Sequence, residues 1–476
     1  MQKILLFIAS LFYFNFLFSK NEIKSWQGIH ETPLSRLEQQ FAEPPVEFAN
    51  HVIWGWEGKM DKKTICNDLD SIKKKGFRAV IFEAGYKLPF KYLSEEWFKA
   101  IRTGVVEAKK RDMKVWIIDE GKYPSGFAGG KFSQERPDLR MQALVIGDTI
   151  QIKRGEVMTN HKIAPEIISA VAVSTSGAPN RTIEINNGKI SFNAGLDDWK
   201  ILLVKSDFRT AVTRAVNNPN GGKDATNSLC DYLNPVAVQQ FIDWTHKQYK
   251  KYLGKELGTT VLGFRGDEPD YAHLPWTPSI VQTFKDTKGY DPTPYLASFF
   301  TASPTIQEQR VKADYWDVWS SLFATHFFKL QADWCAANGV AHITHLNKEH
   351  EMPACVKAEG DYFRALSKVQ IPGVDAIWNQ IWPSTLNDFP KLASSVAHVY
   401  GKPRAFSESF AAYHISPTIP QAKFVVDHQI ARGINFFEFM FWLAGSKHRN
   451  WMSDPGMKGL NEYTNRTTYL MSQGEP

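Results

Sequence analysis

The stretch Val261-Leu-Gly-Phe-Arg-Gly-Asp-Glu268 is a strand-forming run that ends in two carboxylates, and Pro269 follows it directly. Three other strand-like runs also end in a carboxylate: Val80-Ile-Phe-Glu83, Val115-Trp-Ile-Ile-Asp-Glu120 and Arg404-Ala-Phe-Ser-Glu408. Helical patterns separate these runs, so the chain alternates between strand and helix. Parallel strands with acids at their carboxyl ends form the catalytic mouth of a (β/α)8 barrel, or TIM barrel. The sequence therefore predicts an α/β fold of this kind.

Eight strands can be assigned along the chain, and helical patterns lie between most of them. A capping residue begins several of these helices and a glycine ends them, as Asp61 and Gly76 do for the first. The predicted strands cover residues 51–56, 77–83, 113–120, 260–268, 341–347, 374–378, 404–408 and 434–442.

The alternation breaks after the third strand. Short apolar runs with turn signals follow, and Asn186-Asn-Gly188 is a strong hairpin turn. This pattern predicts a small all-β module inserted after the third strand. The expected parts are a signal peptide at 1–19, an exposed leading segment at 20–49, the first part of the barrel at 50–137, the β module at 138–230 and the second part of the barrel at 231–476.

The first 19 residues have the pattern of a secretory signal peptide, with Lys3 before a run that is apolar except for Ser10 and Asn15. The run is shorter than the about 20 residues that a membrane-spanning helix needs. We therefore expect a secreted or periplasmic protein without stable membrane insertion; a retained single-span anchor is the alternative. The net charge is only +6 and the basic residues are dispersed, so no nucleic-acid partner is expected.

Glu268 and Glu408 end the fourth and seventh predicted strands, which lie on opposite sides of a barrel mouth. Their carboxyl groups could therefore flank one bond. Glycoside hydrolysis needs one protonated carboxyl group to donate to the leaving oxygen and one ionised group to act as base or nucleophile. A turn or a solvated loop acid is the alternative interpretation of each residue. We predict a glycoside hydrolase that acts on an oligosaccharide or glycan, with Glu268 and Glu408 as catalytic residues.

Further residues at or after strand ends are candidates for holding the sugar. Aromatic residues make up 13% of the chain, with 15 Trp, and flat aromatic faces suit the apolar faces of sugar rings. Core packing is the alternative for each aromatic residue taken singly. Carboxylates and neutral histidines can bond to sugar hydroxyls. The predicted substrate-binding residues are Trp56, Glu83, Glu120, Asp267, His345 and Trp378.

Two carboxylates stand beside a glycine in Ala358-Glu-Gly-Asp361, after the fifth strand. Such a pair could bind a hard cation or vicinal sugar hydroxyls. Asp361 could equally cap the next helix. The nearby His342, His345 and His350 do not have the spacing of a zinc site, and we interpret them as sugar-binding or packing residues.

Several stretches, in this order along the chain, together resemble one enzyme family. They are Tyr123-Pro-Ser-Gly-Phe-Ala-Gly-Gly130, Gly266-Asp-Glu-Pro-Asp270, Trp276-Thr-Pro278 with Lys288-Gly-Tyr-Asp291, Glu359-Gly-Asp361, Ile371-Pro-Gly-Val-Asp375, Phe406-Ser-Glu408 and Arg432-Gly-Ile-Asn435. The set is similar to glycoside hydrolase family 106, the α-L-rhamnosidase family, and the resemblance covers residues 50–476.

The resemblance implies an exo-acting enzyme that releases terminal α-L-rhamnose by an inverting mechanism, with a calcium ion contacting the sugar. It implies Glu268 and Glu408 as the acid/base pair and Glu359 as a calcium or sugar ligand. Members of the family continue into C-terminal β-sandwich domains, whereas this chain stops at Pro476, so we expect a fragment or a minimal form. A catalytically silent carbohydrate-binding barrel, or a truncated paralogue, is the alternative function.

Strand position and the resemblance differ on stereochemistry. Acids on the fourth and seventh strands are typical of many retaining enzymes, whose carboxyl groups lie about 5–5.5 Å apart. Inversion needs room for a water molecule and a separation of about 6.5–9.5 Å. We follow the resemblance and expect inversion.

Overall fold

The computed structural model describes residues 24–209, 228–269, 271, 274–302, 304–445 and 450–474. The predicted signal peptide at 1–19 lies outside these residues. Within the described part of the chain, no helix combines the length and the apolar character needed to cross a membrane.

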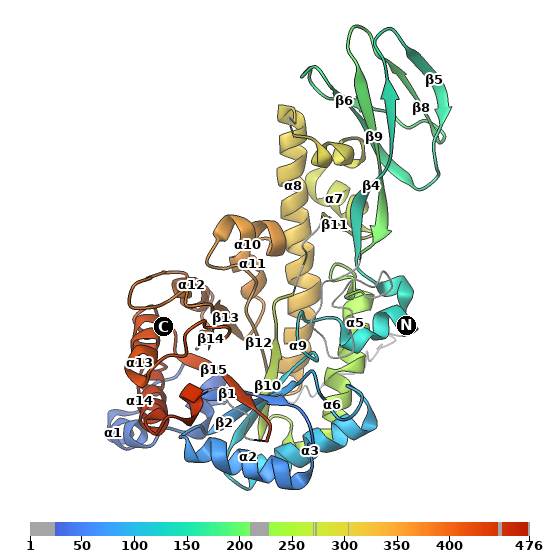
Figure 1. Cartoon of the computed structure of the whole chain (residues 1–476). Helices are drawn as coiled ribbons and strands as arrows, with labels where there is room; N and C mark the ends of the chain where they lie inside the picture. Colours follow the sequence, from blue (N-terminus) through green and yellow to red (C-terminus); the bar gives the residue numbers. More distant parts are fainter. Residues whose placement is uncertain are drawn as a thin grey trace, which may run out of the picture.

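Eight parallel strands close into a barrel with helices around it, which confirms the predicted (β/α)8 fold (Figure 1). The strands follow one another around the barrel in the order β1-β15-β14-β13-β12-β10-β3-β2. Seven are buried along their whole length or all but one residue, because the interior covers one face and the helices the other. Their bounds are β1 (His51–Trp56), β2 (Ala79–Ala84), β3 (Lys114–Ile118), β10 (Val261–Gly266), β12 (Ala341–Thr344), β13 (Ile371–Ala376), β14 (Phe406–Ser409) and β15 (Phe436–Leu443).

Local capping chemistry sets the start of several helices. Asp61 accepts a hydrogen bond from the Thr64 backbone N–H at 2.9 Å, and Asp361 accepts one from that of Arg364 at 3.0 Å, so Asp361 does cap a helix. The α-helices of the described residues are α1 (Leu34–Ala42), α2 (Lys62–Lys74), α3 (Glu95–Lys109), α4 (Lys131–Glu135), α5 (Pro235–Trp244), α6 (His246–Leu253), α7 (Ile280–Lys288), α8 (Ile306–Leu322), α9 (Lys329–Ala337), α10 (Met352–Glu359), α11 (Tyr362–Leu366), α12 (Pro390–Val399), α13 (Ile419–Ile430) and α14 (Met457–Leu470).

The all-β module predicted after the third strand is present as an antiparallel sheet with a core of its own, built around Trp199 and Ile201. The sheet has the order β11-β4-β9-β6-β7, and β5 pairs separately with β8. It stands away from the barrel beside the far end of α8 (Figure 1). The strands are β4 (Gln142–Ile152), β5 (Val157–Lys162), β6 (Ile167–Ser174), β7 (Arg181–Ile183), β8 (Lys189–Asn193), β9 (Trp199–Phe208) and β11 (Pro275–Trp276), the last from the loop after β10.

The leading segment before β1 was expected to be exposed, and two of its aromatic residues correct that expectation. Trp26 and Phe48 are each only 2% exposed and pack with Trp116 and Phe436 inside the barrel. The Trp26 and Trp116 rings meet edge to face at 5.9 Å. A barrel interior is a packed core and needs a cover at its end, and here the segment before the first strand supplies it.

The strand β10 carries one extra residue relative to β3, because Val261 pairs with Val115 while Gly263 pairs with Trp116. Leu262 belongs to the apolar interior of the barrel, and Arg265 also points inward. Two residues three positions apart face opposite sides of a regular strand. The bulge therefore turns Arg265 into the barrel.

Candidate active site

Three acids stand side by side on neighbouring strands at the carboxyl end of the barrel. The register pairs Asp375 with Glu408, and Glu408 with Glu438. Phe406 and Phe436, two residues earlier on their strands, belong to the apolar interior. Because side chains alternate along a strand, Glu408 and Glu438 point into the barrel above this interior.

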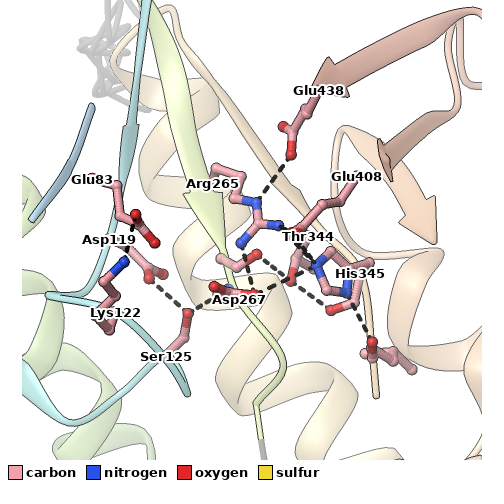
Figure 2. A network of polar contacts seen from close by, with 12 residues as sticks. Glu83, Asp119, Lys122, Ser125, Arg265, Asp267, Thr344, His345, Glu408 and Glu438 are labelled. Atoms are coloured by element: carbon pink, nitrogen blue, oxygen red, sulfur yellow. Dashed lines mark hydrogen bonds and ion pairs between the residues drawn. The ribbon is translucent and has the colours of Figure 1, made fainter. Parts of the chain in front are cut away.

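Arg265 supplies positive charge to Glu408 and Glu438 of this row and to Asp267 (Figure 2). Its guanidinium contacts Glu408 through Nη2, Asp267 through Nη1 at 2.7 Å and Glu438 through Nε at 3.2 Å. The side chain is 0% exposed. A buried arginine needs such partners for its donors, and its planar fork can serve several carboxylates at once. Arg265 therefore fixes the positions of these three acids relative to each other.

His345 follows β12 and lies between two of the same carboxylates (Figure 2). Its Nε2 is 3.3 Å from Glu408 Oε2 and 3.5 Å from Asp267 Oδ1, while Nδ1 lies 2.8 Å from the Leu346 carbonyl oxygen. Burial and the charge of Arg265 lower the pKa of His345, but Asp267 and Glu408 outweigh them and raise it well above its ordinary value. Arg265 Nη2 also lies 2.8 Å from the same Nε2, so this ring nitrogen lies among one cation and two carboxylates.

Glu268 lies two residues beyond β10 with φ 36°, in a region that side chains other than glycine rarely adopt. Its carboxyl group converges with His345 and Asp375, and one ligand atom from each lies within 4.8 Å of the others. Burial, together with the charges of Asp267 and Glu408, raises the pKa of Glu268 to about 7. Glu268 is partly exposed, whereas Glu408 is only 7% exposed. A carboxyl group that keeps its proton near neutral pH therefore faces the solvent side of the site.

Two more of the predicted residues lie at the mouth. Although burial opposes it, Arg265 and His345 lower the pKa of Asp267 to about 2, so this carboxylate stays ionised. Glu83 accepts a hydrogen bond from Lys122 Nζ at 2.7 Å. Burial raises the pKa of Glu83, and the charge of Lys122 opposes that shift. The carboxylates of both residues lie at the mouth, and each has a cationic partner: Arg265 for Asp267 and Lys122 for Glu83 (Figure 2).

Trp56 was predicted to bind the sugar, and the structure corrects this. Its side chain is 0% exposed and packs against Trp54, Phe82 and Trp97 in the layer between barrel and helices. Ile53, three residues earlier, faces the barrel interior. The alternation along β1 therefore directs Trp56 outward, where it cannot stack on a sugar.

Glu120 was also predicted to contact the substrate, and its carboxylate is used elsewhere. Oε1 accepts hydrogen bonds from the backbone N–H groups of Gly121 at 2.7 Å and Gly129 at 3.1 Å, and Oε2 accepts one from Ala128. The side chain is 1% exposed. Glu120 therefore shapes the glycine-rich loop after β3 from within.

Trp378 and Glu359 differ sharply in accessibility. Trp378 lies two residues beyond β13 with φ 52° and is 53% exposed, so an aromatic face is free to meet a ligand. Glu359 is the last residue of α10 and is 0% exposed. It lies near Cys355 and belongs to neither group of converging ligand atoms around His345.

Sequence reasoning did not single out Arg265, Asp375, Glu438 or Glu349 as site residues. Glu349 accepts a hydrogen bond from the Leu346 backbone N–H at 3.0 Å, and burial raises the pKa of Glu349 to about 8. Period-two alternation within the predicted strands could have found Asp375 and Glu438. The inward direction of the Arg265 side chain depends on the bulge in β10, and the sequence of the strand does not reveal that bulge.

The chain is similar to several known proteins. A family model described as alpha-L-rhamnosidase, Glyco_hydro_106, matches residues 156–475. A Formosa agariphila protein named "Putative beta-glucuronidase" is 23% identical over 518 residues, which cover 93% of this chain and 42% of that protein. The structure of a rhamnosidase from Novosphingobium sp. PP1Y has a TM-score of 0.69 and 15% identity, over 92% of this chain and 61% of that one. The chain thus spans less than half the length of the Formosa protein. The Novosphingobium enzyme has the same fold as this chain.

Proposed function

Because the chain belongs to glycoside hydrolase family 106, described as alpha-L-rhamnosidase, we propose that it is an exo-acting α-L-rhamnosidase that removes terminal rhamnose from glycans. The observation that carries the proposal is the different environment of two acids that both lie beside His345. Glu268 has a pKa raised to about 7, while Glu408 is bonded to Arg265 and His345. One carboxyl group can thus donate a proton while the other accepts one.

In this mechanism Glu268 is the general acid and Glu408 the general base. Glu268 transfers its proton to the glycosidic oxygen as the bond to the anomeric carbon breaks. Glu408 takes a proton from a water molecule that attacks the opposite face of the sugar, so that the product has the inverted configuration. Arg265 and His345 contact the Glu408 carboxylate and fix its position in the site.

The sugar ring would lie against the exposed face of Trp378, with Asp267 and Glu83 at its hydroxyl groups. Their ionised or lysine-paired carboxylates accept hydrogen bonds at the mouth. We include export in the proposal, on the pattern of residues 1–19. The substrate would then be an extracellular or periplasmic glycan.

Calcium stays a prediction. Calcium binds oxygen ligands, whereas both groups of converging ligand atoms at the site include a nitrogen of His345. Glu359, the ligand implied by the family resemblance, belongs to neither group. The residues around His345 do not fit a calcium ion, and no catalytic step is assigned to one.

The proposal is tested by turnover of aryl glycosides by the full chain. An aryl α-L-rhamnoside should be hydrolysed, and an aryl β-D-glucuronide is included because of the name of the Formosa protein. Glu268→Gln and Glu408→Gln should each lower kcat by about 10²–10⁴-fold, because each removes one proton-transfer step. Glu462→Gln, a change at an exposed position on α14, is the matched control.

Wild-type-like turnover in either variant would remove that residue from the chemistry. Binding of rhamnosides without turnover by the unaltered chain would favour the silent binding barrel instead. Proton NMR of the first product should show the β-anomer, and the α-anomer would overturn inversion. EDTA is added in parallel, and a loss of activity that calcium chloride restores would establish the ion.

A further inference from the structure

Away from the mouth, three potential metal ligands converge between the barrel and its helices. His246 is the first residue of α6, Cys335 lies on α9 and His342 lies on β12. One ligand atom from each lies within 4.8 Å of the other two. Cys335 and His246 are 0% exposed and His342 is 1% exposed. Nothing in the reaction proposed above uses this cluster.

The hydrogen bonds around His246 determine which of its nitrogens carries a lone pair. Thr245 Oγ1 donates to the Phe241 carbonyl oxygen at 2.7 Å, so it can accept from His246 Nδ1, which lies 2.9 Å away. The N–H is then on Nδ1 and the lone pair on Nε2. Metal-binding histidines use the same arrangement, in which the nitrogen that does not bind the metal donates to a fixed acceptor.

Two ring nitrogens of the cluster have no hydrogen-bond partner among the described residues. Nε2 of His246 and Nδ1 of His342 are buried and accept no hydrogen bond from any described residue. Buried polar atoms in folded proteins are almost always paired, and an unpaired one calls for an explanation.

Aromatic rings pack against His246. The His246 ring lies 4.2 Å from that of Phe264 and 5.3 Å from that of Trp334, measured between centroids. His342 points outward from β12, since Ala341 and Ile343 on either side of it belong to the barrel interior. The site is therefore apolar, and offers two imidazole nitrogens and one sulfur.

We propose that His246, Cys335 and His342 bind one Cu(I) ion. Two imidazoles and a thiolate are a donor set that copper favours, and soft thiolates select Cu(I) over hard cations. Structural zinc takes four ligands, whereas this buried cluster supplies three. Cu(I) with one thiolate is also neutral, while Zn²⁺ would leave a net positive charge in an apolar site.

Binding replaces a proton and transfers no electron. The S–H bond of Cys335 breaks, its proton leaves to solvent, and a sulfur–copper bond forms with copper remaining in the +1 state. The ion would join α6, α9 and β12. The ion would be a structural link. Its ligand His342 lies three residues before His345 on the chain, but the ion would take no part in the reaction.

The test uses the full chain, refolded anaerobically from denaturant with Cu(I) or with Zn²⁺ and then washed with a copper chelator. Mass spectrometry should find one copper per chain, with an unfolding temperature several degrees higher, because the ion binds the folded state. Cys335→Ser should lose the copper. Cys355→Ser, which alters another fully buried cysteine, is the matched control and should keep it.

If Cys335→Ser fails to fold, X-ray absorption of the copper-loaded unaltered chain decides, and should show one sulfur and two nitrogen ligands. Unaltered chain that retains no copper would overturn the proposal. So would copper retained in full by Cys335→Ser, or zinc retained in place of copper.

Discussion

At the mouth of the barrel, Arg265 contacts Asp267, Glu408 and Glu438, while no ion pair joins it to Glu268. Contact with the guanidinium does not by itself keep an acid ionised, because burial raises the pKa of Glu438 to about 7 although Glu438 contacts Arg265. The pKa of Glu268, raised to about 7, follows from burial and from the charges of Asp267 and Glu408. Glu268 and Glu408 therefore have different surroundings, as the proposed acid and base roles require.

The pH dependence of kcat/KM should report the proton on Glu268. Glu268 is protonated below its pKa of about 7 and ionised above it, so activity should be lost as pH rises through about 7. Steady-state rates between pH 5 and 9 would measure this. In Glu268→Gln the remaining activity should lack that decline, whereas Glu462→Gln should keep it. A decline that persists unchanged in Glu268→Gln would assign it to another group.

At the scale of single elements, strand β10 combines a bulge with a glycine that has no room for a side chain. Its bulge at Leu262 turns Arg265 inward, and the next residue, Gly263, is pressed between neighbouring strands. A Cβ at Gly263 would lie 2.2 Å from the Ala341 carbonyl oxygen and 2.3 Å from the Trp116 ring. Both neighbours belong to the barrel and have little room to move. Glycine is therefore required here by close approach.

Gly263→Ala should destabilise the chain by about 1–3 kcal/mol or more, because overpacking forces the strands apart. It should also lower activity, since Arg265 lies two residues away on the same strand. Denaturant unfolding followed by circular dichroism measures the first effect. The matched control is Gly459→Ala on α14, where a Cβ meets nothing within 4 Å and alanine should stabilise by up to about 1 kcal/mol. Equal stability of the two variants would contradict this account.

At the scale of the whole molecule, the barrel is closed at one end by the chain before β1 and extended at the other by the antiparallel sheet. Trp26 and Phe48 cover the interior end, while β4 to β9 form a body with a separate core, beside α8 (Figure 1). The mouth with Glu268 and Glu408 lies at the carboxyl ends of the strands. Stability of the barrel therefore depends on residues far in sequence from the site.

Trp26→Ala should cost about 3–5 kcal/mol, because a fully buried tryptophan leaves a cavity beside Trp116. Thermal unfolding would measure the loss. Trp378→Ala is the matched tryptophan control, since Trp378 is 53% exposed, and its stability should change by at most about 0.5 kcal/mol. Trp378→Ala should instead raise KM for the rhamnoside. A stable Trp26→Ala variant would show that the leading segment is not needed to close the barrel.

The amino-acid sequence determined the strand and helix order, the barrel, the inserted β module and the positions of Glu268 and Glu408 at strand ends. These follow from local patterns: apolar runs, caps, turns and carboxylates just after a strand. Such patterns are set by neighbours along the chain, so they can be recognised without knowing what lies across the fold.

Only the tertiary structure decided which side chains meet. Trp56 faces the helices because of the phase of β1, and Arg265 faces the barrel because of one extra residue in β10. A shift of one residue moves a side chain to the other face of a strand, and the register between strands depends on distant contacts. The protonation of Glu268 likewise depends on charges from β14 and from the segment after β12. Electrostatics acts through space, and spatial distances do not follow separation along the chain.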